Sequence, residues 1–357
     1  MEQYSSDFVI VGQGLSGSVL AYSLWKQGQS VIVLDDPSMA SSSKVAGGIY
    51  NPVTGKKLTK TWMADELFPF LASFYTELEE VLGDSFFYPL PIYRPFSNVQ
   101  IQDIFKQEGA TDGFAGFGTV QFDGEAYQEL VQYELGGVTT SHSGWLDLPK
   151  MLKAFRSFFL EKGILKEIQL NLNNVLPEQL VYEEEGLQIS FKKLIFCEGD
   201  HARHNPFFNW LPFTSVKGEV LTVTMEQDFE EIINQGVFVI PLGNRHYRVG
   251  ATYSWHSLDG IPTESAKAEL LTKYKKLMKP DCEVIEHLAG VRPATKDRRP
   301  FLGLHPKFSQ LAIFNGMGSK GVSLAPYFAK EMADFLLSEK ELNPEVNINR
   351  YVSFYTE

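Results

Sequence analysis

A glycine-rich turn close to the start of the chain constrains the fold more than any other feature. The apolar run 8–11 leads into Gly12-Gln-Gly14-Leu-Ser-Gly17, and apolar residues at helical spacing continue towards Gly28. A second apolar run, 31–34, ends at Asp35. This order of strand, glycine turn, helix, strand and acid is typical of the β-α-β unit that binds dinucleotides. A glycine turn in an ordinary β-α-β unit remains the alternative.

The glycines of this turn have separate physical roles. Gly12 would permit the tight turn out of the strand, Gly14 would let the backbone approach a pyrophosphate, and Gly17 would let the helix pack on the strand. Leu15 and Ser16 would open the helix, whose free N–H groups and positive dipole end attract phosphates. We therefore expect these residues to hold the phosphates of a dinucleotide.

Acidic and small residues follow the second strand. Asp35 is in register to accept hydrogen bonds from a ribose hydroxyl, which disfavours a 2′-phosphorylated cofactor, and Asp36 is an alternative acid. The unit alone does not distinguish NAD from FAD. The next loop could hydrogen-bond phosphates or the ribityl chain of a flavin, although a plain surface loop is also possible. Its candidate residues are Ser43, Ala46, Gly47 and Gly48.

The remaining periodicity predicts two interleaved domains. Helical patterns cover 64–83, 148–163, 263–277 and 329–337, and strand patterns cover 86–95, 113–122, 193–197, 216–224, 236–253 and 311–314. We predict an α/β fold in which a Rossmann-like nucleotide-binding domain is interleaved with an antiparallel-sheet α+β substrate domain. The first would comprise 1–60, 145–205 and 285–357, and the second would comprise 61–144 and 206–284.

Two tracts near the C-terminus decide between cofactors. They are Gly290-Val-Arg292-Pro and Asn315-Gly-Met-Gly-Ser-Lys-Gly321, the second followed by Ala-Pro. With the N-terminal turn they resemble the D-amino-acid oxidase superfamily of FAD-dependent oxidoreductases, which includes glycine oxidase and sarcosine oxidase. The second tract is also similar to the oxidase domain of the bifunctional bacterial enzyme that modifies the tRNA wobble uridine. The methyltransferase half of that enzyme has no counterpart in this sequence.

The resemblance implies that the nucleotide-binding domain is an FAD-binding domain and that the protein oxidises an amine or amino acid. Arg292 would bind a substrate carboxylate, and hydride transfer to flavin N5 would leave an imine. A structural ion pair is the alternative role for Arg292. Lys320 would add positive charge beside the flavin or point to solvent. The other residues that would border the cofactor are Gly199, Gly290, Gly316, Met317, Gly318, Ser319 and Gly321.

The sequence departs from the family pattern at three places. Met317 stands where many members have histidine, and Phe238 stands where D-amino-acid oxidases have a carboxylate-binding tyrosine. A phenyl ring donates no hydrogen bond, so a free D-amino acid is a doubtful substrate. Neither Cys197 nor Cys282 lies where sarcosine oxidases attach flavin, so we expect noncovalent FAD. Further pocket candidates, each of which could instead be core, are Tyr50, Arg94 and Tyr253, with Trp62, Tyr93 and Trp255.

Charge and composition exclude several other classes of function. The net charge of −12 disfavours binding to an extended nucleic acid, although a local basic cluster at 56–60 remains possible. No metal-ligand spacing, signal peptide or membrane-length apolar run occurs, so we expect no metal and a cytoplasmic protein. The electron acceptor, O2 or another molecule, and the oligomeric state stay open. The alternatives are removal of a carboxymethyl group from a modified tRNA wobble uridine, and a noncatalytic flavin-binding protein.

Overall fold

The computed structural model describes residues 2–55, 58–107, 114, 116–338 and 340–356. Its first sheet has the order β11-β2-β1-β14-β13-β12, and β21, which pairs with β20, adds to the C-terminal half of β14. The β11, β2, β1, β14 and β21 strands run parallel, as expected for a nucleotide-binding sheet. The strands are β1 (Glu2–Val11), β2 (Val31–Leu34), β11 (Leu165–Lys166), β12 (Val175–Leu176), β13 (Val181–Glu184), β14 (Leu187–Phe196), β20 (Phe301–Leu304) and β21 (Leu311–Asn315).

Helices cover the first sheet and bury its apolar residues. The helices are α1 (Leu15–Lys26), α4 (Leu148–Glu161) and α6 (Gly321–Ser338), and α2 (Ala64–Leu82) packs against α6. The α1 and α6 helices contact each other closely although they come from opposite ends of the chain. Their shared core includes Val19, Phe155 and Phe328, each fully buried. Removing this apolar surface from water holds the two chain ends together.

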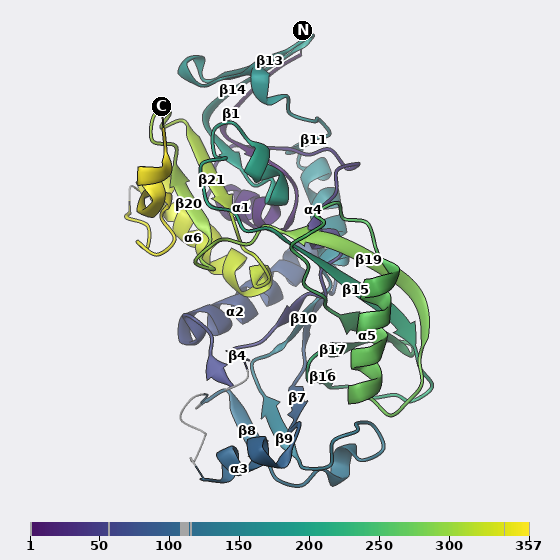
Figure 1. Ribbon diagram of the computed structural model, residues 1–357. Coiled ribbons are helices and arrows are strands. Elements are labelled where there is room, and N and C mark those ends of the chain that lie inside the picture. The colour runs from purple at the N-terminus through teal and green to yellow at the C-terminus, as the bar shows by residue number, and fades with distance from the viewer. Residues whose placement is uncertain (1, 56–57, 108–113, 115, 339, 357) are drawn as a thin grey trace.

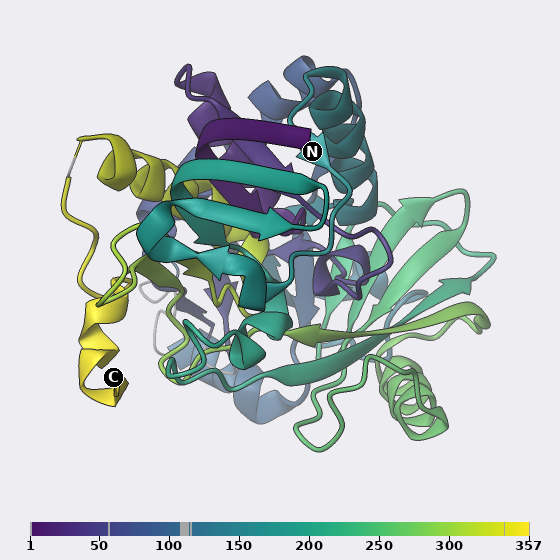
Figure 2. The same cartoon turned by 90° about the horizontal axis from the view of Figure 1, so that it is seen from above.

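The second sheet lies below the first in Figure 1 and beside it in Figure 2. Its order is β19-β15-β18-β17-β16-β7-β9-β8, and β16 with β7 forms its parallel pair. The α5 helix covers one face (Figure 2) and packs on a core around Leu221 and Tyr247. The elements are β7 (Ile92–Pro95), β8 (Gly118–Gln121), β9 (Gly137–Thr140), β15 (Val216–Thr224), β16 (Ile232–Asn234), β17 (Phe238–Gly243), β18 (His246–Gly250), β19 (Glu283–Arg292) and α5 (Glu264–Leu277).

Short elements complete the fold outside the two large sheets. The remaining elements are β3 (Ile49–Tyr50), β10 (Gly144–Leu146) and β6 (Phe87–Pro89) in one small sheet, the hairpin β4 (Val53–Thr54) and β5 (Thr59–Lys60), and α3 (Val99–Gln107). Within the described part of the chain, no helix is both long and apolar enough to cross a membrane.

The observed arrangement confirms the predicted α/β fold with a Rossmann-like sheet and an antiparallel substrate-domain sheet. Several strands differ in extent from their predicted ranges. The strand predicted at 193–197 is the end of the long strand β14. In the first half of β14, buried residues alternate with more exposed ones. The pattern at 236–253 is the hairpin β17–β18. The domain ranges stay a prediction, and the boundary proposed at residue 285 falls inside β19.

Candidate active site

The turn after β1 is packed too closely for side chains at two of its glycines. A Cβ atom on Gly17 would lie 1.9 Å from the carbonyl oxygen of Gly12. A Cβ atom on Gly12 would lie 2.8 Å from the carbonyl oxygen of Cys197, and the φ of Gly12 is +99°, which favours glycine. Both contacts are with backbone, which cannot move aside. These two glycines therefore set how α1 and β14 pack against β1.

Gly14 has a different environment, because a Cβ atom there would make only ordinary contacts. The hydroxyl oxygens of Ser43 and Ser41 would lie 3.5 and 3.6 Å from it. The backbone N–H of Leu15 donates to Ser43 Oγ over 3.2 Å, and Gly14 itself provides no side-chain cap. Hydroxyls and helix N–H groups thus surround an accessible backbone position. This chemistry fits a pyrophosphate at the helix N-terminus, so the residues present suit a dinucleotide.

The two acids after β2 point to different surroundings. Asp35 Oδ1 accepts a hydrogen bond from the backbone N–H of Gln13 over 2.9 Å, and Asp35 Oδ2 pairs with Arg156 Nη1 at 3.2 Å. Asp36 accepts hydrogen bonds from the backbone and hydroxyl of Ser38 in an exposed turn. Asp35 therefore lies against the glycine turn, where the acid that binds the ribose hydroxyls is expected. Asp36 instead stabilises the turn that contains Ser38.

The C-terminal tract lies beside the N-terminal turn. A Cβ atom on Gly321 would lie 3.0 Å from Leu15 Cδ2, and the N–H of Gly318 donates to the carbonyl of Pro293 over 3.2 Å. The Asn315 side chain donates to the carbonyl of Gly199 over 2.9 Å. The predicted cofactor residues of both chain ends thus come together at the same end of the first sheet.

Side chains of the C-terminal tract differ in exposure. Met317 is buried in the core shared by α1 and α6, so its side chain has a packing role. Ser319 and Lys320 are exposed. Desolvation and the neighbouring cations Arg299 and Arg298 lower the pKa of the Lys320 amino group. The structure therefore places positive charge beside the glycine loop.

Glycines also line the face of the second sheet that meets the loop 41–48 after β2, called the cofactor loop below. Gly218 pairs with Gly290 across β15 and β19, and Gly250 pairs with Val220, so their side-chain positions share one face. A Cβ atom on Gly290 would lie 3.2 Å from Val45 Cβ, which belongs to that loop. The absence of side chains at these positions leaves room above the sheet for larger groups.

Arg292 and Phe238 occupy the room above these glycines. The Arg292 guanidinium packs directly on Gly218. A Cβ atom on Gly218 would lie only 2.0 Å from Arg292 Nη2. The Phe238 ring lies between Gly47 and Gly250, with Cζ 2.6 and 2.7 Å from the Cβ positions of these glycines. Phe238 therefore separates the cofactor loop from the sheet by ring packing alone, and it offers no hydrogen-bond donor.

The charge of Arg292 has no carboxylate partner in the described part of the chain. Its guanidinium lies 4.6 Å from the centre of the Tyr253 ring, and Nη1 donates to the carbonyl of Thr252 over 3.3 Å. Among the described residues, no carboxylate lies within 4.0 Å of it. Burial lowers the pKa of Arg292, and Tyr253 partly opposes this effect. An unpaired guanidinium of this kind is suited to bind an anionic group of a ligand.

The other pocket candidates fall into three groups. Tyr50 and Tyr93 are buried, and Tyr50 stacks on Phe87 at 5.3 Å, so both contribute to the core. The Trp62 ring stacks on Phe328, which is also core. Tyr253 is 55% exposed beside Arg292, and Trp255 is 63% exposed and stacks on Tyr253. Arg94 lines a separate cavity between β7, β16 and the β4–β5 hairpin.

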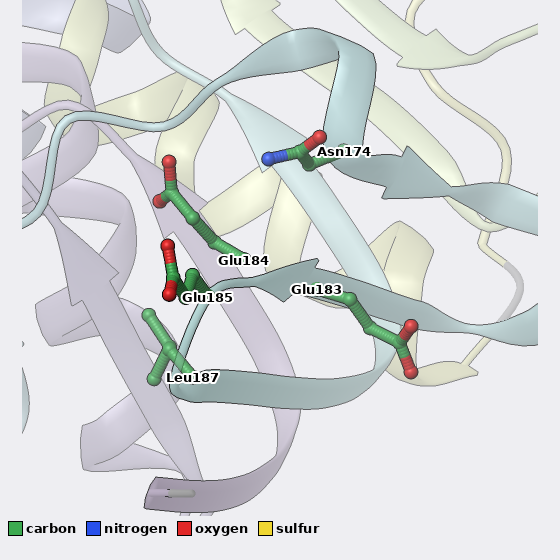
Figure 3. A pocket seen from close by; sticks show the side chains of 5 residues that line it. All are labelled: Asn174, Glu183, Glu184, Glu185 and Leu187. Atoms are coloured by element: carbon green, nitrogen blue, oxygen red, sulfur yellow. The ribbon is translucent and has the colours of Figure 1, made fainter.

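Another cavity lies far from the glycine turn. Figure 3 shows the Glu184 and Glu185 side chains close together at the hairpin between β13 and β14, whereas Glu183 points away. This hairpin is next to the first residues of β1, and the glycine turn follows the last residues of that strand. In the described parts of the chain, no group of three histidine, cysteine, aspartate or glutamate residues could hold a metal ion.

Sequence reasoning missed several residues of this region. Arg156 pairs with Asp35 from α4, and Gly218 makes room for Arg292 from the neighbouring strand. Glu198 lies two residues after the end of β14, with its Cα 3.6 Å from the Cβ position of Gly12. Burial raises the pKa of its carboxyl to about 7. An acid after a buried strand was a visible signal for Glu198. The other two contacts depend on tertiary packing.

Comparisons with known proteins agree with this geometry. The family model "DAO: FAD dependent oxidoreductase" matches residues 7–335. The chain belongs to this family. It is therefore an FAD-dependent oxidoreductase of the amino-acid oxidase type, and FAD is the cofactor that family membership assigns.

Individual relatives are more distant. The chain is 30% identical over 135 residues to glycine oxidase from Pseudomonas aeruginosa, covering 37% of each protein. It is 25% identical to the tRNA 5-methylaminomethyl-2-thiouridine biosynthesis bifunctional protein MnmC from Hahella chejuensis, over 92% of this chain and 56% of that protein. The aligned regions thus span between about a third and just over half of these curated relatives.

Solved structures share the whole fold. Glycine oxidase from Geobacillus kaustophilus matches with a TM-score of 0.80 at 18% identity, covering 98% of both chains. Iminodiacetate oxidase from Chelativorans sp. BNC1 matches with a TM-score of 0.78 at 21% identity, covering 96% of this chain and 98% of that chain. At these identities the likeness shows the fold alone.

The two kinds of glycine should respond differently to alanine. Gly17→Ala places a Cβ against a backbone carbonyl, so we expect a clearly lower melting temperature of the FAD-free protein. Gly14→Ala makes only ordinary contacts, so we expect an unchanged melting temperature but FAD binding at least tenfold weaker, measured by fluorescence titration. Equal FAD affinity for Gly14→Ala and wild type would contradict the phosphate-binding role.

Glu198 should make stability depend on pH. Because its folded-state pKa is raised above the ordinary 4.5, the folded protein keeps the proton longer than the unfolded chain, and stability falls as pH rises through about 7. Glu198→Gln removes this cost. We expect it to raise the melting temperature of the FAD-free protein more at about pH 8 than at about pH 5. Glu185→Gln, on an exposed turn, is the control, and an equal gain at both pH values would contradict the assignment.

Proposed function

We propose that the protein oxidises the C–N bond of a carboxylate-bearing amine, such as an N-substituted glycine, with Arg292 binding the carboxylate. The observation that carries this proposal is the partly buried Arg292 guanidinium. It has no carboxylate partner in the described chain, and it packs on Gly218, which has no side chain to displace it. Its planar fork can make two parallel hydrogen bonds to a carboxylate. Bound in this way, the substrate is fixed in orientation, which lowers the entropic part of the barrier.

Bound FAD would supply the redox chemistry by taking up a hydride from the substrate carbon, and water would then hydrolyse the imine product. The chain supplies binding and orientation. The glycine turn and Ser43 would hold the pyrophosphate, Asp35 the ribose, and the 316–321 loop with Lys320 would favour negative charge on the reduced ring. Cys197 is buried and burial raises its thiol pKa, which agrees with noncovalent FAD.

Phe238 supports a preference for secondary amines over free D-amino acids. Its ring packs between Gly47 and Gly250 and presents only carbon atoms to its surroundings. The Phe238 side chain cannot donate a hydrogen bond to a substrate carboxylate. The extra apolar surface instead suits an N-substituent, so Phe238 is proposed to act on specificity.

Arg292→Ala should separate substrate binding from cofactor binding. Removing the charged partner of a carboxylate costs about 2–5 kcal/mol, which is roughly 30-fold to several-thousand-fold in kcat/KM. We expect the yellow chromophore to remain bound, because Arg292 lies in the second sheet. Arg245→Ala, on the exposed β17–β18 turn, is the control. Unchanged kinetics with a panel of N-substituted glycines and amino acids would contradict the role of Arg292.

Oxidative removal of a carboxymethyl group from a modified tRNA wobble uridine is the second candidate. The similarity to MnmC extends over 92% of this chain, and the exposed cations Lys296, Arg298 and Lys320 lie near the C-terminal glycine loop. The net charge of −12 opposes it. Of the basic cluster at 56–60, Lys56 and Lys57 lie outside the described residues, and Lys60 pairs with Asp65.

Salt dependence tests the tRNA candidate. If tRNA is the substrate, its affinity should fall steeply between low and physiological salt, because phosphate contacts release counterions. The double variant Arg298→Gln/Lys320→Gln should flatten that dependence. No binding of tRNA at low salt, measured by filter retention, would leave the small-amine function as the remaining one.

A further inference from the structure

A cavity of about 280 Å³ lies where the second sheet meets the β4–β5 hairpin. None of the described residues that line it is acidic, and the polar ones are Asn51, Thr54, Arg94, Thr140 and Asn234. Its volume is just below the range of about 300–1,000 Å³ that is usual for ligand sites, so it suits only a small molecule. Its polar lining offers hydrogen-bond donors and one full positive charge.

The Arg94 charge in this cavity has no counter-charge among the described residues. Arg94 Nε donates to Gln235 Oε1 over 3.0 Å, and Nη1 donates to the carbonyl of Gly55 over 2.7 Å. Both partners are neutral, and no carboxylate of the described chain lies within 4.0 Å of the guanidinium. Burial lowers the pKa of Arg94, as it does for Arg292. A desolvated cation without a counter-ion is costly, and an anion in the cavity would remove that cost.

Strand register places Arg94 on the same face of the sheet as the Arg292 site. Ile233 pairs with Tyr93 in parallel, which sets Asn234 beside Arg94, and Asn234 pairs with Phe238. Cross-strand neighbours project to one face. Arg94, Asn234 and Phe238 therefore form a row on the face that also carries Gly250 and Gly218.

The two arginines are nevertheless too far apart for one small amino acid. The sheet order puts four steps between β7, which carries Arg94, and β15, which carries Gly218 beneath Arg292. Each step is about 4.8 Å, so the two strands are about 19 Å apart. The Phe238 ring, packed on Gly47, lies between them. The cavity is thus a position separate from the proposed substrate carboxylate site.

We propose that this cavity is a second binding site, which takes the carboxylate of a small organic acid. The guanidinium fork of Arg94 binds the carboxylate, and the Asn51 and Asn234 amides and the Thr140 hydroxyl hydrogen-bond to the rest of the ligand. The carboxylate belongs either to a separate acid or to the distal end of an extended substrate. The site does not depend on the role of Arg292, and its Asn51–Gly55 wall follows the cofactor loop directly in the chain.

The experiment uses the FAD-loaded protein with Arg292→Gln, so that binding at the proposed catalytic position does not contribute. Acetate, malonate, succinate, glutarate and inorganic phosphate are titrated by calorimetry. We expect at least one carboxylate to bind this protein. Adding Arg94→Gln should weaken that binding at least tenfold. Adding Asn234→Asp, which keeps the hydrogen bonds of Arg94 but places a negative charge in the cavity, should weaken it similarly. Arg245→Gln is the matched control.

Kinetics distinguish a distal substrate carboxylate from a separate acid. If the carboxylate belongs to the substrate, Arg94→Gln and Asn234→Asp should raise KM at least tenfold only for substrates with a distal carboxylate, with kcat unchanged. Binding of free acids to the Arg292→Gln protein, together with an unchanged KM for every substrate in the Arg94→Gln protein, indicates a separate ligand. The proposal is overturned if no acid binds at millimolar concentration and KM is unchanged. It is equally overturned if the Asn234→Asp protein, with an unchanged melting temperature, binds as wild type does.

Discussion

The close backbone contact within the first β-α-β unit is the constraint on which the rest of the structure depends. The carbonyl of Gly12 fills the space that a side chain on Gly17 would need, and the carbonyl of Cys197 does the same at Gly12. These contacts draw α1, β1 and β14 together, and β14 then pairs with β21. The C-terminal strand and helix are thereby held beside the N-terminal turn, where the predicted cofactor residues of both chain ends meet.

Uncompensated positive charge is the second organising feature. Arg292 and Arg94 both lie on the face of the second sheet that meets the cofactor loop, and burial lowers both pKa values. Arg248, on the same face, has Glu286 at 4.0 Å. In a protein with a net charge of −12, these two arginines have no carboxylate within 4.0 Å in the described chain, and both proposed anion sites rest on this observation. The Phe238 ring, on β17, lies between Arg292 and Arg94 on this face of the sheet.

Much of the fold followed from local patterns. The alternation of apolar runs, glycines and Asp35 predicted the nucleotide-binding unit, and the C-terminal tracts indicated the family that the comparison then confirmed. Individual side chains were less predictable. Tyr50 and Met317 were candidates for the site, and the structure buries both in the core. An aromatic ring or thioether suits a cavity wall and a core equally, so residue type alone does not separate the two.

The sequence by itself determined the β-α-β unit, the acid at its end and the oxidoreductase family, because these depend on residues close together in the chain. Only the tertiary structure decided which charges have partners. Arg156 reaches Asp35 from a helix more than a hundred positions away, and Gly218 makes room for Arg292 from a neighbouring strand. Charge compensation and free volume depend on distances between segments, which no local pattern encodes.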